Sequence, residues 1–130
     1  MICLDSDFLV AILRDNSEAL ASLERFQRED MLATTSINSF EILNGALISS
    51  GGKQKYLRAR SMLNELEVLA FDQTASELAS SLYADMLKKG KPIAISDLYI
   101  GSIALSAGAP VITRNLKDFE RIPGLKVIKW

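Results

Sequence analysis

The sequence predicts an α/β domain in which a short central parallel sheet is flanked by helices on both faces. Short apolar runs alternate with longer segments of helical periodicity, as expected for strands joined by crossover helices. The composition agrees, because 48% of the 130 residues are hydrophobic and 24% are charged, which is ordinary for a globular protein. This length fits one core, so we expect residues 1–130 to form one domain.

The strands are predicted at short apolar runs that end in polar or turn-forming residues. They are expected at Ile2–Leu4, Met31–Thr34, Glu67–Phe71, Pro110–Thr113 and Leu125–Ile128. The segments between most of these runs are long enough to hold a helix, which parallel neighbours require. The helices are expected at Phe8–Arg14, Glu18–Gln27, Ser36–Ser49, Lys53–Leu66 and Gln73–Lys89, and from Ser96 or Asp97 to Gly108, with Arg114–Phe119 a loop or short helix. Ser6 or Asp7 is the expected cap of the first helix.

The chain contains no histidine, which excludes several kinds of active site. A histidine general base, a Ser-His-Asp or Cys-His arrangement and a histidine-ligated zinc site all require that residue. The single cysteine, Cys3, lies in an apolar run and cannot form an intrachain disulfide. A hydrolase of this composition therefore has to use carboxylates and a hard metal ion.

The charge and hydropathy patterns indicate a cytoplasmic protein that does not enter a membrane. The net charge is −1, so contact with nucleic acid would need a local basic patch. The segment Phe8–Leu13 is short and follows two aspartates, unlike a secretory signal. The longest uncharged stretch, Leu98–Thr113, falls short of the roughly 20 apolar residues of a membrane span.

Polar side chains follow two of the predicted strands directly. Asp5 comes after the first strand, and Thr113, Arg114 and Asn115 lie at the end of a later one. Ligands of open parallel sheets bind beyond the carboxyl ends of the strands. We therefore expect both groups at one edge of the sheet.

Two helices are expected to bring further carboxylates to this edge. In the helix Ser36–Ser49, we expect Phe40, Leu43 and Leu47 to centre the apolar stripe and Glu41 to be half-buried at its border. Asp97 begins a later helix. The small residues Gly101 and Ala104 on its face should let that helix approach the sheet closely.

Each of these polar residues also has a purely structural interpretation. Flanking or capping a helix would explain Asp5 and Asp7, and a place at a helix boundary would explain Glu41. A helix dipole could stabilise Asp97, and turns commonly contain residues such as Asn115 and Asp118. Their joint placement at strand ends and helix starts favours a common site. Clustered carboxylates raise each other's pKa, and Mg²⁺ or Mn²⁺ relieves that repulsion.

Four segments in this order resemble the PIN-domain ribonucleases, and most closely the VapC-type toxins of toxin–antitoxin pairs. They are Leu4–Asp7, Phe40–Gly45, Asp97–Ile100 and Thr113–Phe119, and the ending Ile122–Val127 is similar as well. The likeness covers the whole chain. No single motif is specific, but the four in this spacing are.

The resemblance implies a PIN-like α/β/α domain with metal-dependent endoribonuclease activity, using Mg²⁺ or Mn²⁺. By position, Asp5, Glu41 and Asp97 match the family's acidic residues, and Asn115 stands where a fourth acid is common. We expect catalysis from these four residues and metal binding from the three acids. Supporting roles are expected for Ser6, Asp7, Thr113 and Asp118, with Asp7 where the family usually has Asn.

The resemblance also implies partners, namely an RNA substrate, a cognate antitoxin and a second copy of the chain in a homodimer. Basic residues that could contact RNA phosphates are Arg114, Lys117, Lys53, Lys55 and Arg58, together with Arg60 and the Lys88–Lys91 loop. A solvated helix face is the alternative for the cluster at residues 53–60.

Two other functions remain open at this point. The neutral side chain of Asn115 allows a catalytically weakened PIN-like module that binds RNA or protein. A phospho-receiver domain would need an acceptor aspartate after a middle strand, for which Asp72 is the candidate.

Overall fold

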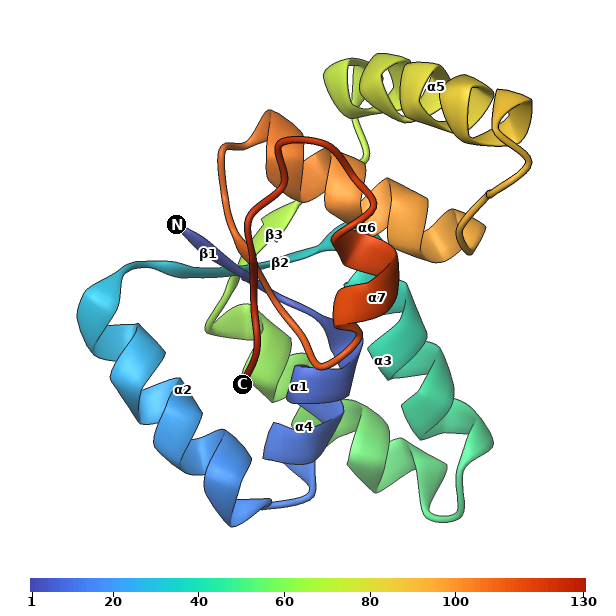
Figure 1. Ribbon diagram of the computed structural model, residues 1–130. Coiled ribbons are helices and arrows are strands. Elements are labelled where there is room, and N and C mark those ends of the chain that lie inside the picture. The colour runs from blue at the N-terminus through green and yellow to red at the C-terminus, as the bar shows by residue number, and fades with distance from the viewer.

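The sheet of this protein is built from five parallel strands (Figure 1). The computed structural model describes all residues 1–130. They are β1 (Ile2–Leu4), β2 (Leu32–Thr35), β3 (Glu67–Leu69), β4 (Val111–Ile112) and β5 (Val127–Ile128). Their order across the sheet is β3-β2-β1-β4-β5, so β1 is central. Cys3 is in register with Ala33 of β2 and with Val111 of β4, and every neighbouring pair is parallel.

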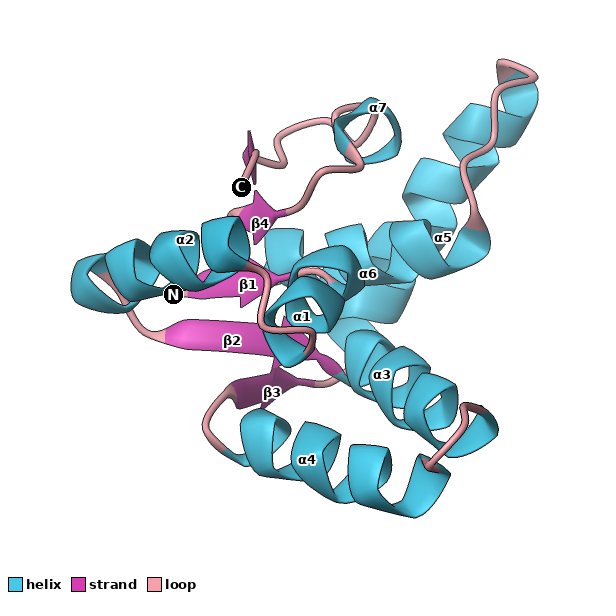
Figure 2. Ribbon diagram, turned by 90° about the horizontal axis from the view of Figure 1, so that it is seen from below, coloured by secondary structure: helices cyan, strands magenta, loops and turns pink.

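Seven helices cover the sheet, in the α/β/α arrangement that the sequence predicts. They are α1 (Ser6–Leu13), α2 (Ser17–Glu29), α3 (Ser36–Ile48), α4 (Gly52–Asn64), α5 (Gln73–Lys88), α6 (Ile95–Ser106) and α7 (Leu116–Phe119). Figure 2 shows α1, α2 and α4 on one side of the sheet and α5 and α6 on the other. Each strand-to-helix junction falls within a few residues of its predicted place.

The core is divided in two by the sheet, and alternation along β1 explains the division. Ile2 and Leu4 belong to a cluster that includes Phe8, whereas Cys3 faces a second cluster on the side of α5 and α6. Successive side chains of a strand point to opposite faces, so one short strand contributes to both cores. Cys3 is fully buried, and burial raises the pKa of its thiol to about 12, in agreement with its prediction as a small hydrophobe.

The apolar stripe predicted for α3 is wrong. Phe40 and Leu47 are 67% and 56% exposed, and the residues that α3 buries are Asn38 and Ile42. The helix is therefore turned relative to the expectation, and Glu41 is exposed rather than half-buried.

The expected helix caps also differ from the structure. Ser6 is the first residue of α1 rather than its cap. The N-cap of α1 is Asp5, whose carboxylate makes no capping hydrogen bond. Helix α6 begins at Ile95, so Asp97 lies in its first turn and does not cap it. The close approach predicted at Gly101 is present, but the nearest atoms belong to the Ile122 side chain and not to the sheet.

Two further expectations can be compared with the fold. Asp72 follows β3, which is an edge strand, and its side chain accepts a hydrogen bond from Ala75 N of α5, so the phospho-receiver hypothesis lacks its middle strand. None of the helices has the length and apolar character needed to span a membrane.

Candidate active site

The strand order brings two distant segments together beside β1. The chain moves outward from β1 through β2 to β3 and then adds β4 and β5 on the opposite side, so the order reverses between β1 and β4. Ligands of open α/β sheets bind at such switch points. Asp5 and Thr113 follow these two strands, and the Thr113 hydroxyl donates a hydrogen bond of 2.7 Å to Asp5 Oδ2.

The second oxygen of Asp5 is held by a residue that the sequence analysis did not select. Asn38 is fully buried in the first turn of α3, where its amide nitrogen donates to Asp5 Oδ1 at 3.0 Å and to Ser6 Oγ at 2.8 Å. Its carbonyl oxygen accepts from the Thr35 hydroxyl. Asn38 lies four residues before the buried Ile42 and therefore on the same face of α3. Because α3 carries polar residues on every side, its sequence gives no signal that this face is the buried one.

Glu41 lies next to this group although it is exposed. The Ser6 hydroxyl donates to Glu41 Oε1 at 2.9 Å, and the same hydroxyl accepts from Asn38. One chain of hydrogen bonds therefore runs from Asp5 through Asn38 and Ser6 to Glu41. The structure thus brings together the first two acids that the sequence analysis selected.

The other half of the site comes from α6 and the segment after β4. The Asn115 amide nitrogen donates to Asp97 Oδ2 at 3.2 Å and to Asp118 Oδ2 at 3.4 Å. This neutral amide donates to both carboxylates and so offsets part of the repulsion between them. Its carbonyl oxygen makes no hydrogen bond within the chain and stays available as a neutral oxygen ligand.

The pKa shifts of Asp97 and Asp5 indicate that the carboxylates of the site lie within electrostatic range of one another. The pKa of Asp97 is raised from 3.8 to about 6, first by burial and then by the negative charges of Asp5, Asp118 and Glu41. The pKa of Asp5 is also raised, mainly because the residue is only 6% exposed, while hydrogen bonds from Thr113 and Asn38 oppose the increase. The cluster therefore carries an excess of negative charge that is costly to maintain in the folded protein.

The donor set of the cluster fits a hard divalent cation. All of its ligand atoms are oxygens, from carboxylates, the Asn115 amide and hydroxyls, and Mg²⁺ binds through one or two carboxylates with waters filling its remaining positions. No group of three or more acidic side chains is placed to hold a metal ion together, so a cation here would be bound by one or two carboxylates with water completing its shell. An open arrangement of this kind leaves coordination positions for water and substrate.

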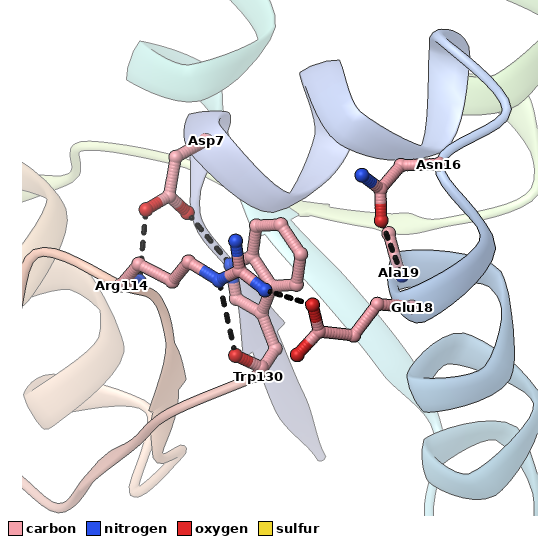
Figure 3. A network of polar contacts seen from close by, with 6 residues as sticks. All are labelled: Asp7, Asn16, Glu18, Ala19, Arg114 and Trp130. Atoms are coloured by element: carbon pink, nitrogen blue, oxygen red, sulfur yellow. Dashed lines mark hydrogen bonds and ion pairs between the residues drawn. The ribbon is translucent and has the colours of Figure 1, made fainter.

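Asp7 connects the site to the last residues of the chain (Figure 3). Its Oδ2 accepts from Arg114 N at 2.8 Å and from the Thr113 hydroxyl at 3.3 Å, and its Oδ1 accepts from Trp130 Nε1 at 3.2 Å. The Trp130 ring stacks on Phe8 with centroids 5.1 Å apart. Asp7 therefore holds the backbone at Arg114, directly after Thr113, and its supporting role at the site stays a prediction.

The guanidinium of Arg114 is engaged in the same network. It lies 3.6 Å from the centroid of the Trp130 ring, its Nε donates to the Trp130 carbonyl oxygen, and it forms an ion pair of 2.7 Å with Glu18 (Figure 3). Contact between Arg114 and an RNA phosphate would have to replace these interactions. The predicted binding of RNA by Arg114 would therefore compete with its contacts to Trp130 and Glu18.

The remaining basic residues are exposed at varying distances from the acidic cluster. Lys55 and Arg58 of α4 line a cleft that also contains Glu41, whereas Lys53 does not line it. Lys117 lies on α7 beside Asp118. No contact joins the Lys88–Lys91 segment to the acidic cluster.

Comparison with known proteins identifies the fold and its group. The PIN domain model matches residues 2–125. The chain belongs to the PIN domain family. This PIN domain is 30% identical over 128 residues to a protein of Salmonella typhimurium described as the tRNA(fMet)-specific endonuclease VapC, which covers 98% of this chain and 96% of the relative. It is 30% identical over 129 residues to a ribonuclease VapC1 of Haemophilus influenzae, with the same coverage.

Solved structures of VapC-type proteins have the same fold as this PIN domain. The complex VapBC2 of Rickettsia felis bound to a DNA fragment from its promoter contains a chain with a TM-score of 0.91 and 27% identity, covering 100% of this chain and 99% of that one. DNA-bound VapBC of Salmonella typhimurium gives a TM-score of 0.89 at 27% identity, with the same coverage. The predicted resemblance to VapC-type members is confirmed.

Proposed function

We propose that this protein is a divalent-metal-dependent endoribonuclease that hydrolyses RNA phosphodiester bonds in the cytoplasm as the toxin of a type II toxin–antitoxin pair. The observation that carries the proposal is the placement of Asp5 and Asp97 together at the switch point between β1 and β4, where Thr113 and Asn115 hold them by hydrogen bonds. The raised pKa of Asp97, caused partly by Asp5, Asp118 and Glu41, agrees with this placement. A carboxylate cluster that keeps this much negative charge at a sheet switch point is suited to a cation and a phosphate. The full-length similarity to proteins named as VapC ribonucleases supports the same reaction.

Asp5, Asp97 and Glu41 would hold the cation, either Mg²⁺ or Mn²⁺, with Asn115 or Asp118 as a further contributor. When bound, such an ion lowers the pKa of a coordinated water and neutralises charge on a phosphate oxygen. The chain itself orients the ligands. Asn38 and Thr113 each fix one oxygen of Asp5, and the Asn115 amide fixes Asp97.

The partners proposed for the chain are a cognate antitoxin and a second copy of itself. Support for the antitoxin comes from the VapBC complexes, whose chains share the fold. Support for protein contacts of either kind comes from α3, where Phe40, Leu47 and Ile48 are 67%, 56% and 79% exposed. These three residues recur at helical spacing, so they form an apolar stripe of the kind that marks an interface.

The test is cleavage of a labelled RNA with and without Mg²⁺ or Mn²⁺, comparing wild type with Asp5→Asn and Asp97→Asn. Each substitution keeps the size of the side chain and removes one charge, and we expect a loss of activity of at least 100-fold because ligand carboxylates are hard to replace. Asp85→Asn is the matched control, since Asp85 is exposed on α5 and outside the cluster. Unchanged cleavage by both site variants would contradict the site assignment.

Calorimetry with Mn²⁺ separates this proposal from the alternative of a catalytically weakened binding module. The enzyme requires metal binding that Asp97→Asn weakens and Asp85→Asn does not. RNA binding without any metal binding at millimolar Mn²⁺ would instead favour the module. The similarity to full-length ribonucleases favours the enzyme.

A further inference from the structure

A cleft of about 280 Å³ lies between α1, α3 and α4 and borders the acidic site. Glu41 belongs to both the cleft and the site. Its carboxylate accepts a hydrogen bond from the Ser6 hydroxyl in the site, and its side chain also lines the cleft. A molecule bound in the cleft would therefore lie directly beside the cluster of carboxylates.

The charges that line this cleft favour an anion. Arg14, Lys55 and Arg58 all contribute to its wall, and Glu41 at the boundary with the site is its only acid. The larger cleft of the protein, about 630 Å³ beside α2, has the opposite character. It contains Asp30, Glu65 and Glu67, no lysine or arginine, and eight hydrophobic residues among its thirteen.

Two of the three cations are available for a ligand. Arg14 and Lys55 form no ion pair within the chain, and both are exposed. Arg58 pairs with Asp15 at 3.0 Å, with the two side chains 57% and 70% exposed. An ion pair this exposed contributes only about 0–1 kcal/mol, so a phosphate can replace Asp15 at little cost.

Apart from Ser49, the rest of the wall is apolar, and it leaves open space at Gly45. Val10, Leu13, Ile42 and Ala46 supply aliphatic surface on which a ribose or a base can lie. Gly45 faces open space, because a Cβ placed there would meet no atom within 4 Å. The volume is just below the roughly 300–1,000 Å³ of small-ligand sites.

We propose that this cleft holds the RNA strand on one side of the scissile phosphate, with Arg14 and Lys55 bound to backbone phosphates and Glu41 marking the boundary with the cutting site. The proposal rests on the proposed function, since it assigns the track by which the substrate reaches that site. A single-stranded, polyanionic segment matches the two unpaired cations and the narrow aliphatic wall.

The test begins with binding, measured without divalent metal so that RNA stays intact. Fluorescence anisotropy of a labelled single-stranded oligoribonucleotide is recorded with wild type, Arg14→Gln/Lys55→Gln and the charge-matched control Lys126→Gln/Lys129→Gln. We expect about tenfold weaker binding in the cleft variant, and a salt dependence whose log–log slope falls by about 1.4, because each single-stranded phosphate contact contributes about 0.7. The control variant should change neither the site nor the cleft.

A second variant blocks the cleft without changing its charge. Gly45→Leu places a side chain in the open space, and it should not weaken the fold because leucine favours a helix more than glycine does. We expect weaker RNA binding with an unchanged salt slope. In cleavage assays with Mg²⁺, both cleft variants should raise the RNA concentration for half-maximal rate while changing the maximal rate less than threefold.

The outcomes separate this proposal from the proposed function. Loss of RNA binding in the cleft variants of a protein that cuts no RNA would support the track and contradict the nuclease. Wild-type RNA affinity in both cleft variants would overturn the track, whatever the rate of cleavage. Loss of antitoxin binding in those variants at unchanged RNA affinity would assign the cleft to a protein partner and overturn it as well.

Discussion

Asp5 is the only buried acidic side chain of the protein. It is 6% exposed, one of its oxygens accepts from Asn38 and the other accepts from Thr113. A carboxylate fixed in this way loses little side-chain freedom when it binds a cation, because its orientation is already determined. Its position after the first strand made it predictable from the sequence.

Asn38 shows where sequence reasoning at the level of single residues fails. Glu41 was selected as a carboxylate expected at the border of an apolar stripe, but the buried neighbour that connects it to Asp5 is a neutral amide in the first turn of α3. A pattern of charges does not reveal which amides are buried. Only the rotation of α3 about its axis decides that Asn38, rather than Ser39 or Phe40, faces the site.

Asn115→Asp is expected to strengthen cation binding and weaken the metal-free protein. The change adds a carboxylate and removes the amide group that donates hydrogen bonds to Asp97 and Asp118. We expect Mn²⁺ affinity at pH 7.5, measured by calorimetry, to rise on the order of tenfold, since affinity for such ions follows ligand charge.

The control for this change is Asn64→Asp, which adds the same charge at an exposed position on α4. The melting temperature without divalent cations should fall in Asn115→Asp, because its new charge faces two others. Weaker Mn²⁺ binding than in wild type would show that the amide itself is the preferred ligand.

The secondary-structure elements were predicted better than the faces they present. Every helix and strand has its counterpart in the sequence analysis, because the apolar runs and their polar breaks are local signals. The buried face of α3 was predicted wrongly, because Phe40 and Leu47 look like core residues when the sequence is considered alone. Their exposure is consistent with contacts to another molecule, and a single sequence does not distinguish such contacts from the core of its own domain.

Two glycines in helix interiors should respond oppositely to alanine. A Cβ at Gly101 of α6 would lie 2.2 Å from Ile122 Cδ1, and Ile122 is 1% exposed, so it has little room to move. Overpacking of this kind costs about 1–3 kcal/mol. At Gly45 of α3 the Cβ meets nothing, so Gly45→Ala should stabilise the protein by about 0.5–1 kcal/mol.

Chemical denaturation of the two variants measures this difference. Ile122→Val should restore part of the stability lost in Gly101→Ala, because it removes the methyl group that the new Cβ meets. Equal stabilities for Gly101→Ala and Gly45→Ala would contradict the close approach of α6 to the segment after α7.

At the scale of the whole molecule, the strand order is what the sequence leaves open. The parallel sheet follows from alternating strands and helices, but nothing local places β1 between β2 and β4. That placement needs the resemblance to a known family or the structure itself. Once it is known, the meeting of Asp5 with Thr113 follows from the sheet alone.

The acidic cluster should make the stability of the metal-free protein decrease as pH rises from about 4 to 6. The folded pKa of Asp97 lies above its ordinary value of 3.8, at about 6, and that of Asp5 is raised too, so the folded state binds more protons than the unfolded state in this window. Thermal melting in the presence of a chelator, compared between wild type and Asp97→Asn, measures this contribution. A smaller decrease in the variant is expected.

Divalent cations should reverse this trend at higher pH. Mg²⁺ binds the ionised carboxylates of the folded protein, so it should raise the melting temperature more at pH 7.5 than at pH 5. Identical pH profiles for wild type and Asp97→Asn, with no effect of Mg²⁺ on either, would show that the carboxylates do not act as one cluster.

The 108 residues that separate Asp5 from Thr113 also set an order of events during synthesis. While the ribosome makes the chain, β1 can pair with β2 early, but its other edge stays open until β4 has emerged. Asp97, Asn115 and the Thr113 hydroxyl all arrive late, so the nascent chain has only half of its cutting site. A chain with the proposed ribonuclease activity would therefore be inactive until β4 and the segment that carries Asn115 have been synthesised.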